Sequence, residues 1–211
     1  MWHFPVNHLD NKRGSSLIEI MAMIAVLWIA IAAMFSTVIW GIYFAKDSES
    51  KIKAINLARE GIEGITNLRN TNWLRFSSDQ INCWRIEWYQ SSCIWNNSFA
   101  TSNSVWTGWS TISYVLENKN GAWYLTGTTS GSWLWVDNNG FYYSSGTTAG
   151  DIRCNFEITT NCRSPFTRII KVFIPSWNTW SMSIKSTVDW FDKRAQNVTV
   201  ETTLTNWKSK F

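Results

Sequence analysis

The side chains able to act as nucleophiles, bases or metal ligands are few and unevenly placed. Both histidines, His3 and His8, lie near the start of a 211-residue chain. If the chain is cut at Gly14, no histidine remains, and imidazole bases, Ser-His-Asp triads and His-ligated metals are excluded. We also find no nucleophile–base set, phosphate loop or metal motif in the sequence. We therefore expect neither an enzyme nor a cofactor.

Four cysteines form two local pairs, Cys83 with Cys93 and Cys154 with Cys162. Neither pair has the Cys-x-x-Cys spacing of zinc or thioredoxin-like sites. An even number of cysteines in an exported domain favours disulfides, and four cysteines allow three connectivities. We favour the two local bonds, and the alternative is four reduced, buried thiols.

An Asp/Asn cluster at residues 137–140 contains oxygen ligands of the kind that calcium prefers. It lacks the distal acidic ligand of an EF-hand loop. It also separates two strand-like segments, residues 133–136 and 141–143, which favours a turn. We expect no metal there.

These residues must be positioned by the rest of the chain, which begins with a long apolar segment. Residues 20–45 contain no charged side chain, and about 20 apolar residues suffice to cross a bilayer. Lys12 and Arg13 precede the segment, so the positive-inside rule places the N-terminus in the cytoplasm and the remainder outside. We expect a single-pass membrane protein.

One carboxylate, Glu19, opens this apolar segment, where an unpaired charge is costly. The preceding residues read Lys-Arg-Gly-Ser-Ser-Leu-Ile up to Glu19. This resembles the processing site of type IV pilin and pseudopilin precursors, where a short basic leader and a glycine precede a glutamate-headed apolar helix. The resemblance implies cleavage by prepilin peptidase between Gly14 and Ser15, and methylation of the new α-amine of Ser15. The commonest first residue in the family is phenylalanine, so Ser15 departs from the pattern.

The same resemblance gives Glu19 a role in assembly. In the family, the glutamate is thought to neutralise the α-amine of a neighbouring subunit. A paired buried carboxylate is tolerated and a lone one is expensive, so this pairing would select the axial register. The implied partners are other pilin subunits, prepilin peptidase, an inner-membrane assembly platform and membrane lipid. The implied destination is an extracellular pilus or an envelope pseudopilus.

Two other interpretations of the N-terminus stay open. Glu19 could lie among lipid headgroups as part of a plain anchor. Ala30-Ile31-Ala32 could be a signal peptidase site, and cutting there would release a secreted protein that begins at Ala33. In either case the remainder would be an anchored or secreted β-domain adhesin or other binding protein.

The helix is expected to continue past the membrane, because no proline occurs between Pro5 and Pro165. An amphipathic stripe with helical spacing predicts one buried face, formed by Ile52, Ile55, Ala58, Ile62, Ile65 and Leu68. Residues 57–73 and 182–207 also resemble pilin-like proteins. We therefore divide the chain into a leader (1–14), a transmembrane helix (15–45), its amphipathic continuation (46–73) and an exported head (74–211).

The remaining chain is typical of β-structure. Asn120-Gly121 between residues 112–117 and 122–126 is a hairpin signal. Three further strands are expected at residues 167–174, 182–190 and 197–204, of which the last two alternate well. The predicted fold is α+β, with a long N-terminal helix packed on an antiparallel sheet.

The composition argues against a nucleic-acid partner and shows an unusually large number of tryptophans. The net charge of +4 is too weak to indicate a nucleic-acid partner. The chain has 16 tryptophans, and some, such as Trp109 and Trp177, stand where glycine would fit a turn. They could be core and membrane-belt packing, a glycan-binding face, or glycine codons of a lineage that reads UGA as glycine.

Overall fold

The computed structural model describes residues 12–76, 83–95, 113–119, 122–128, 131–144, 153–154, 161–174 and 180–206. The chain divides into two compact units, Met1–Glu49 and Ser50–Phe211. We call them the N-terminal unit and the head unit. Among the described residues, the N-terminal unit is helix only, whereas the head unit combines helix with a β-sheet.

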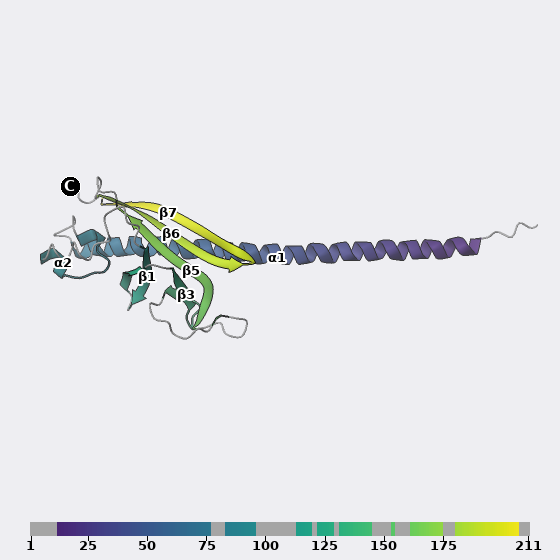
Figure 1. The fold of residues 1–211 in the computed structure, drawn as a ribbon, viewed down its shortest axis with the longest axis horizontal. Coiled ribbons are helices and arrows are strands. Elements are labelled where there is room, and N and C mark those ends of the chain that lie inside the picture. Colours follow the sequence, from purple (N-terminus) through teal and green to yellow (C-terminus); the bar gives the residue numbers. More distant parts are fainter. Residues whose placement is uncertain are drawn as a thin grey trace, which may run out of the picture. The chain divides into compact units, whose positions relative to one another are not determined.

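A single helix, α1 (Lys12–Arg75), contributes to both units (Figure 1). It ends at Arg75, two residues beyond the expected end at residue 73. Phe76 still donates its backbone N–H to the Asn72 carbonyl at 2.8 Å. Arg75 places a positive charge in the last turn, where the helix dipole favours it. We call residues 12–49 the leading segment and residues 50–75 the packing segment.

In the described part of the head unit, seven strands form one sheet, and all the pairings between these strands are antiparallel. Strand β5 is at its centre, because it pairs with β6 along one edge and with both β3 and β1 along the other. Strands β2 and β4 extend β1 and β3, and β7 pairs with β6. The bounds are β1 Ser113–Lys119, β2 Ala122–Thr128, β3 Ser132–Val136, β4 Tyr142–Ser144, β5 Cys162–Phe173, β6 Ser181–Asp192 and β7 Arg194–Thr205.

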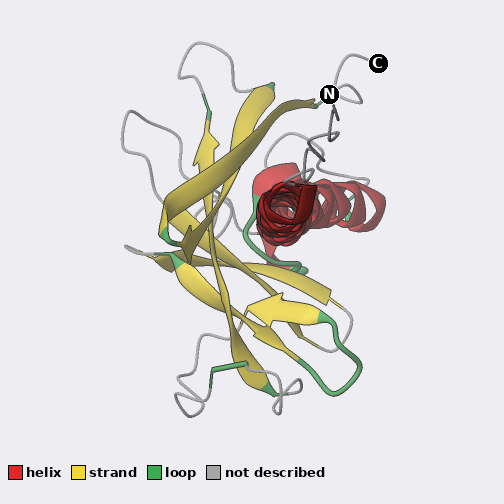
Figure 2. Cartoon of the chain, turned by 90° about the vertical axis from the view of Figure 1, so that its right-hand side faces the viewer, coloured by secondary structure: helices red, strands yellow, loops and turns green. Residues whose placement is uncertain are grey.

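This arrangement confirms the predicted α+β fold. Figure 1 shows β5, β6 and β7 beside the packing segment, and Figure 2 shows the strands on one side of the helix. The expected hairpin is present, since Lys119 pairs with Ala122; its turn residues 120–121 lie outside the described residues. The three C-terminal strands are also present, and each is longer than the sequence pattern predicted.

The Asp/Asn cluster forms the turn between β3 and β4. The Asp137 carboxylate accepts backbone N–H groups from Asn139 and Phe141, both at 2.8 Å. Gly140 has a φ of 81°, which a residue with a side chain rarely adopts. The carboxylate that seemed suited to calcium is therefore used to hold the turn.

Two short helical turns were not predicted. They are η1 (Cys83–Arg85) and α2 (Ser92–Trp95). Ile86, between them, is buried together with Phe76 and the disulfide-bonded Cys83 and Cys93. This small cluster adjoins the end of α1.

The core lies between the packing segment and the sheet. Near the start of the packing segment, Ala54, Leu57 and Ala58 contact residues of β3, β5 and β6. Further along, Ile65 and Leu68 contact the larger cluster, which includes Ile170 of β5 and residues of β1, β2, β6 and β7. One expectation was wrong: Ile52, predicted on the buried face, is 59% exposed.

The buried face is rotated because two glycines bring the helix close to the sheet. A Cβ on Gly61 would lie 2.6 Å from the Ser186 hydroxyl, and a Cβ on Gly64 would overlap the Leu116 side chain. Both glycines and both neighbours are buried. The helix therefore turns Gly61 and Gly64 toward the strands, and Ile52 toward solvent.

Candidate functional site

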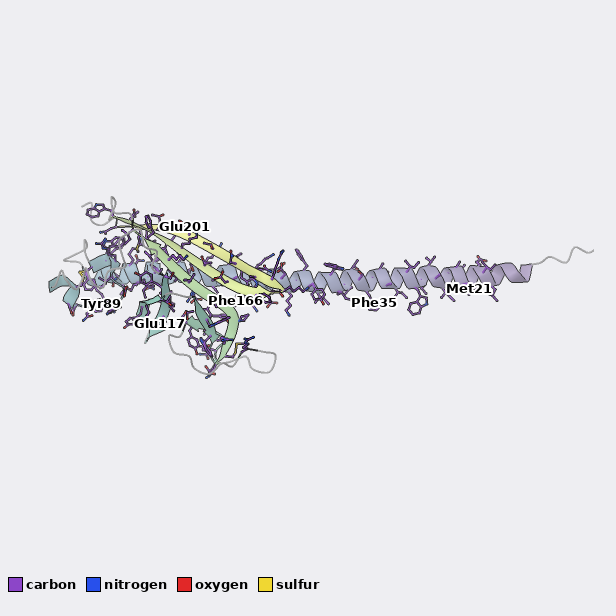
Figure 3. The ribbon with its side chains drawn as sticks, in the orientation of Figure 1. Met21, Phe35, Tyr89, Glu117, Phe166 and Glu201 are labelled. Carbon is purple, nitrogen blue, oxygen red and sulfur yellow. A yellow bond between two sulfur atoms is a disulfide. The ribbon has the colours of Figure 1, made fainter. Side chains whose placement is uncertain are left out.

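The leading segment has an apolar surface that no other described part of the chain covers. Met21 and Phe35, labelled in Figure 3, are 64% and 66% exposed. Trp28 and Trp40 are 68% and 73% exposed. Such a surface is stable only against lipid or other apolar partners. From Leu17 onward, α1 is the one helix in the described part of the chain that is long and apolar enough to cross a membrane.

The three residues of the predicted processing and assembly site lie in the first turns of α1. The helix begins at Lys12, so Gly14, Ser15 and Glu19 all belong to it. Ser15 and Glu19 are four positions apart, a spacing that places two residues on one face of a helix. In this uncleaved chain the bond between Gly14 and Ser15 is therefore helical.

Glu19 heads a shallow apolar groove along the leading segment. The side chains that line it with Glu19 include Ala22, Met23, Val26 and Ala30. This spacing keeps them on the face that carries Glu19. The small alanines allow another helix to approach closely, as in membrane helix pairs. The Glu19 carboxylate, at the end of this groove, would lie close to any charged group that such a helix carries at the same level.

In the head unit, Arg168 of β5 fixes the packing segment to the sheet. Its side chain is only 2% exposed. The guanidinium donates to the Leu57 carbonyl at 3.1 Å and to the Ser144 hydroxyl at 3.4 Å, and lies 3.3 Å from the Glu60 carboxylate. Burial lowers the pKa of Arg168, and the charge and hydrogen bond of Glu60 oppose that shift. Sequence reasoning missed this contact, because Arg168 and Leu57 are 111 residues apart.

The end of α1 is tied to two distant segments. Trp73 donates its indole N–H to the Asn206 side chain at 3.1 Å, next to the end of β7. Asn72 donates to the Ile86 carbonyl at 3.2 Å. Beside Ile86, burial raises the pKa of the Glu87 carboxyl to about 7.

Both expected disulfides are present. Cys83 is bonded to Cys93 and Cys154 to Cys162, with Cα atoms 5.8 and 4.9 Å apart. No free cysteine remains. No group of three or more His, Cys, Asp or Glu able to hold a metal occurs among the described residues. The cysteines therefore cross-link the head unit.

Most of the described tryptophans fall into two classes, and Trp88 and Trp123 are half-buried. Trp73, Trp84, Trp135 and Trp190 are buried in the head unit, as core packing requires. Trp28, Trp40, Trp133 and Trp180 are exposed by 42% or more. Trp109, Trp177 and Trp207 lie outside the described residues. Core packing therefore explains the buried tryptophans but not the exposed ones.

No family model, curated protein or solved structure matches this chain. Its function must therefore be argued from its own residues.

Proposed function

We propose that this protein is a type IV pilin-like structural subunit, a minor pilin or pseudopilin. The observation that carries the proposal is the run from Lys12 to Glu19 at the start of a long apolar helix. In this proposal prepilin peptidase cuts between Gly14 and Ser15 and methylates Ser15. The cut subunit then leaves the membrane for a filament.

The exposed surface of the leading segment supports the proposal. Removing this much apolar surface from water is worth roughly 25 cal/mol per Å². Lipid can cover it before assembly, and leading segments of other subunits can cover it afterwards. The groove beside Glu19 offers one such packing face.

In this proposal, the charge on Glu19 selects the correct axial register between neighbouring subunits. A neighbouring subunit's methylated amine would neutralise the carboxylate as both groups leave water. A mispaired register would leave a bare carboxylate in an apolar surround, at a cost of several kcal/mol. The head unit, which includes the packing segment, would then be carried on the filament surface.

The test is mass spectrometry of the N-terminus of protein purified from its native cell. We expect a peptide that starts at Ser15 and carries one added methyl group. A peptide starting at Ala33 would make this a secreted β-protein, and an intact leader would make it a plain anchored protein. Either result would overturn the proposal.

A second test addresses assembly directly. The variant Glu19→Ala should be cleaved normally and remain in the membrane fraction, but should be lost from sheared filaments. Ser16→Ala is the matched control and should behave as the unmodified chain. Normal incorporation of Glu19→Ala would remove the assembly role of Glu19.

A further inference from the structure

The hairpin formed by β6 and β7 carries an exposed aromatic side chain close to its turn. Phe191, near the end of β6, is 73% exposed, whereas the preceding residue, Trp190, is buried. Because side chains alternate between the two faces of a sheet, Phe191 lies on the face turned away from α1. Trp133, 43% exposed, and Pro165 line the same hollow as Phe191. We call Trp133, Pro165 and Phe191 the apolar patch.

The turn of this hairpin lies where α1 enters the head unit. At the far end of the hairpin, Asn206 accepts a hydrogen bond from Trp73, near the end of α1. Close to the turn, Trp190 packs in one cluster with Ala54, which follows the first residue of the head unit, Ser50, by one helical turn. The two strands therefore run along the packing segment, as Figure 1 shows, and their turn lies beside its first residues.

This end of the head unit is connected to the apolar part of the chain by a short link. The uncharged run ends at Ala45, five positions before Ser50, and five residues reach no further than about 18 Å. The headgroup layer on each side of a bilayer is about 5–8 Å thick. If the leading segment crosses a membrane, the hairpin turn is therefore held within reach of the lipid surface.

The charges near the hairpin turn are balanced. The acidic Asp189 and Asp192 are matched in number by the basic Lys193 and Arg194. Net charge on the hairpin therefore gives no preference for an anionic or a cationic surface. The apolar side chains are left to decide the contact, and tryptophan and phenylalanine are both frequent where proteins meet the membrane–water interface.

We propose that the apolar patch lies in the headgroup layer of the membrane that the leading segment crosses. Lipid fits the patch because the chain itself holds the two close together. A second copy of the chain is the competing partner, but a stable protein interface buries about 800 Å² on each side, more than three side chains provide. The inference rests on the membrane span of the proposed function, and not on cleavage or filament assembly.

The test measures the depth of nitroxide labels on the full chain in phosphatidylcholine nanodiscs. One label is attached at Phe191→Cys. The matched label is attached at Phe173→Cys, an exposed phenylalanine at the opposite end of the sheet. Oxygen concentrates in lipid, whereas a nickel chelate stays in water. We expect oxygen to relax the label at 191 more strongly, and the nickel chelate to relax it less strongly, than the label at 173.

A second pair of variants separates Phe191 from the label, because a nitroxide has apolar surface of its own. Arg194→Cys carries the label next to the native Phe191 and should also show contact with lipid. Adding Phe191→Ser should shift that label to the accessibility of an aqueous site. Adding Phe173→Ser, the matched control, should leave it unchanged. Both phenylalanines are exposed, so both changes are compatible with the fold.

Four results would overturn the proposal. Equal accessibility of the labels at 191 and 173 would place Phe191 in water. A label at 191 shielded from both oxygen and nickel would indicate a protein partner, such as a second copy. Lipid contact only after phosphatidylglycerol is added would make charge the cause. Release of the chain from vesicles by sodium carbonate would remove the span itself, whereas a retained chain with an aqueous label would refute only the lipid contact.

Discussion

The leading segment and the packing segment belong to the same helix, but their apolar side chains differ in exposure. The leading segment carries large apolar side chains on all sides and leaves them exposed. The packing segment buries large side chains, such as Ile65 and Leu68, together with the small Gly61 and Gly64, against a sheet from the same chain. The difference teaches that apolar bulk left exposed on a helix marks a segment awaiting a partner. The same bulk confined to one buried face marks a segment that already has one.

The largest expected effect comes from the polar contact that fixes the packing segment. Arg168→Met keeps most of the side-chain volume but removes the bonds to Leu57 and Glu60. We expect the head to lose about 2–3 kcal/mol of unfolding free energy, because Glu60 stays partly hydrated and is not left fully buried. Urea unfolding of the full chain in detergent measures this loss.

The control for Arg168→Met is Lys171→Met, an exposed position on the same strand. It should change the unfolding free energy by less than about 0.5 kcal/mol. Equal losses in the two variants would show that the buried guanidinium has no special role in fixing the helix.

The next largest effect is expected from a glycine-to-alanine substitution, made once in each of the two segments of α1. Gly64→Ala adds a methyl group where the Leu116 side chain already lies, whereas Gly41→Ala in the leading segment meets nothing within 4 Å. We expect Gly64→Ala to destabilise the head by about 1–2 kcal/mol through overpacking. Gly41→Ala should leave head unfolding unchanged. Thermal unfolding followed by near-UV circular dichroism distinguishes them, and a tolerated Gly64→Ala would refute the close approach.

The smallest expected effect is a change in the stability of the head with pH. Burial raises the pKa of Glu87 to about 7, so the folded head favours the protonated carboxyl. The stability from this group is complete below the unfolded pKa of about 4.5 and is lost as the pH rises through 7. Glu87→Gln should therefore stabilise the head at pH 8 by about 1 kcal/mol, a figure reduced for its half-exposed position.

The control for Glu87→Gln is the same variant at pH 4, where the native carboxyl is already neutral and no gain is expected. Melting temperatures at both pH values test this. An equal gain at pH 4 and pH 8 would mean that the amide acts by something other than removing a charge.

Sequence alone predicted the elements whose signal is local. The alternation of Ile184, Val188 and Trp190 predicted β6, and Asn120-Gly121 predicted the pairing of β1 with β2. The two disulfides followed from short cysteine spacings. Each of these features depends on residues close together in the chain, which is why a pattern could reveal them.

Features that depend on distant residues were missed. The helical spacing that placed Ile52 on the buried face ignored how closely Gly61 and Gly64 let the sheet approach. Nothing near Arg168 in the sequence shows that it meets Leu57. The pairing of Arg153 with Arg163 follows from a bridge beside the disulfide, not from any recognisable motif.

The contacts of the packing segment can form only after the C-terminal strands have been synthesised. Leu57 meets Arg168 across 111 residues, and Trp73 meets Asn206 across 133. During synthesis the packing segment emerges long before β5, β6 and β7 exist to cover it. Contacts of such long sequence separation slow folding, because a large loop must close before they form. Until the last strands are made, the apolar face of the packing segment has no C-terminal strand of its own chain to cover it.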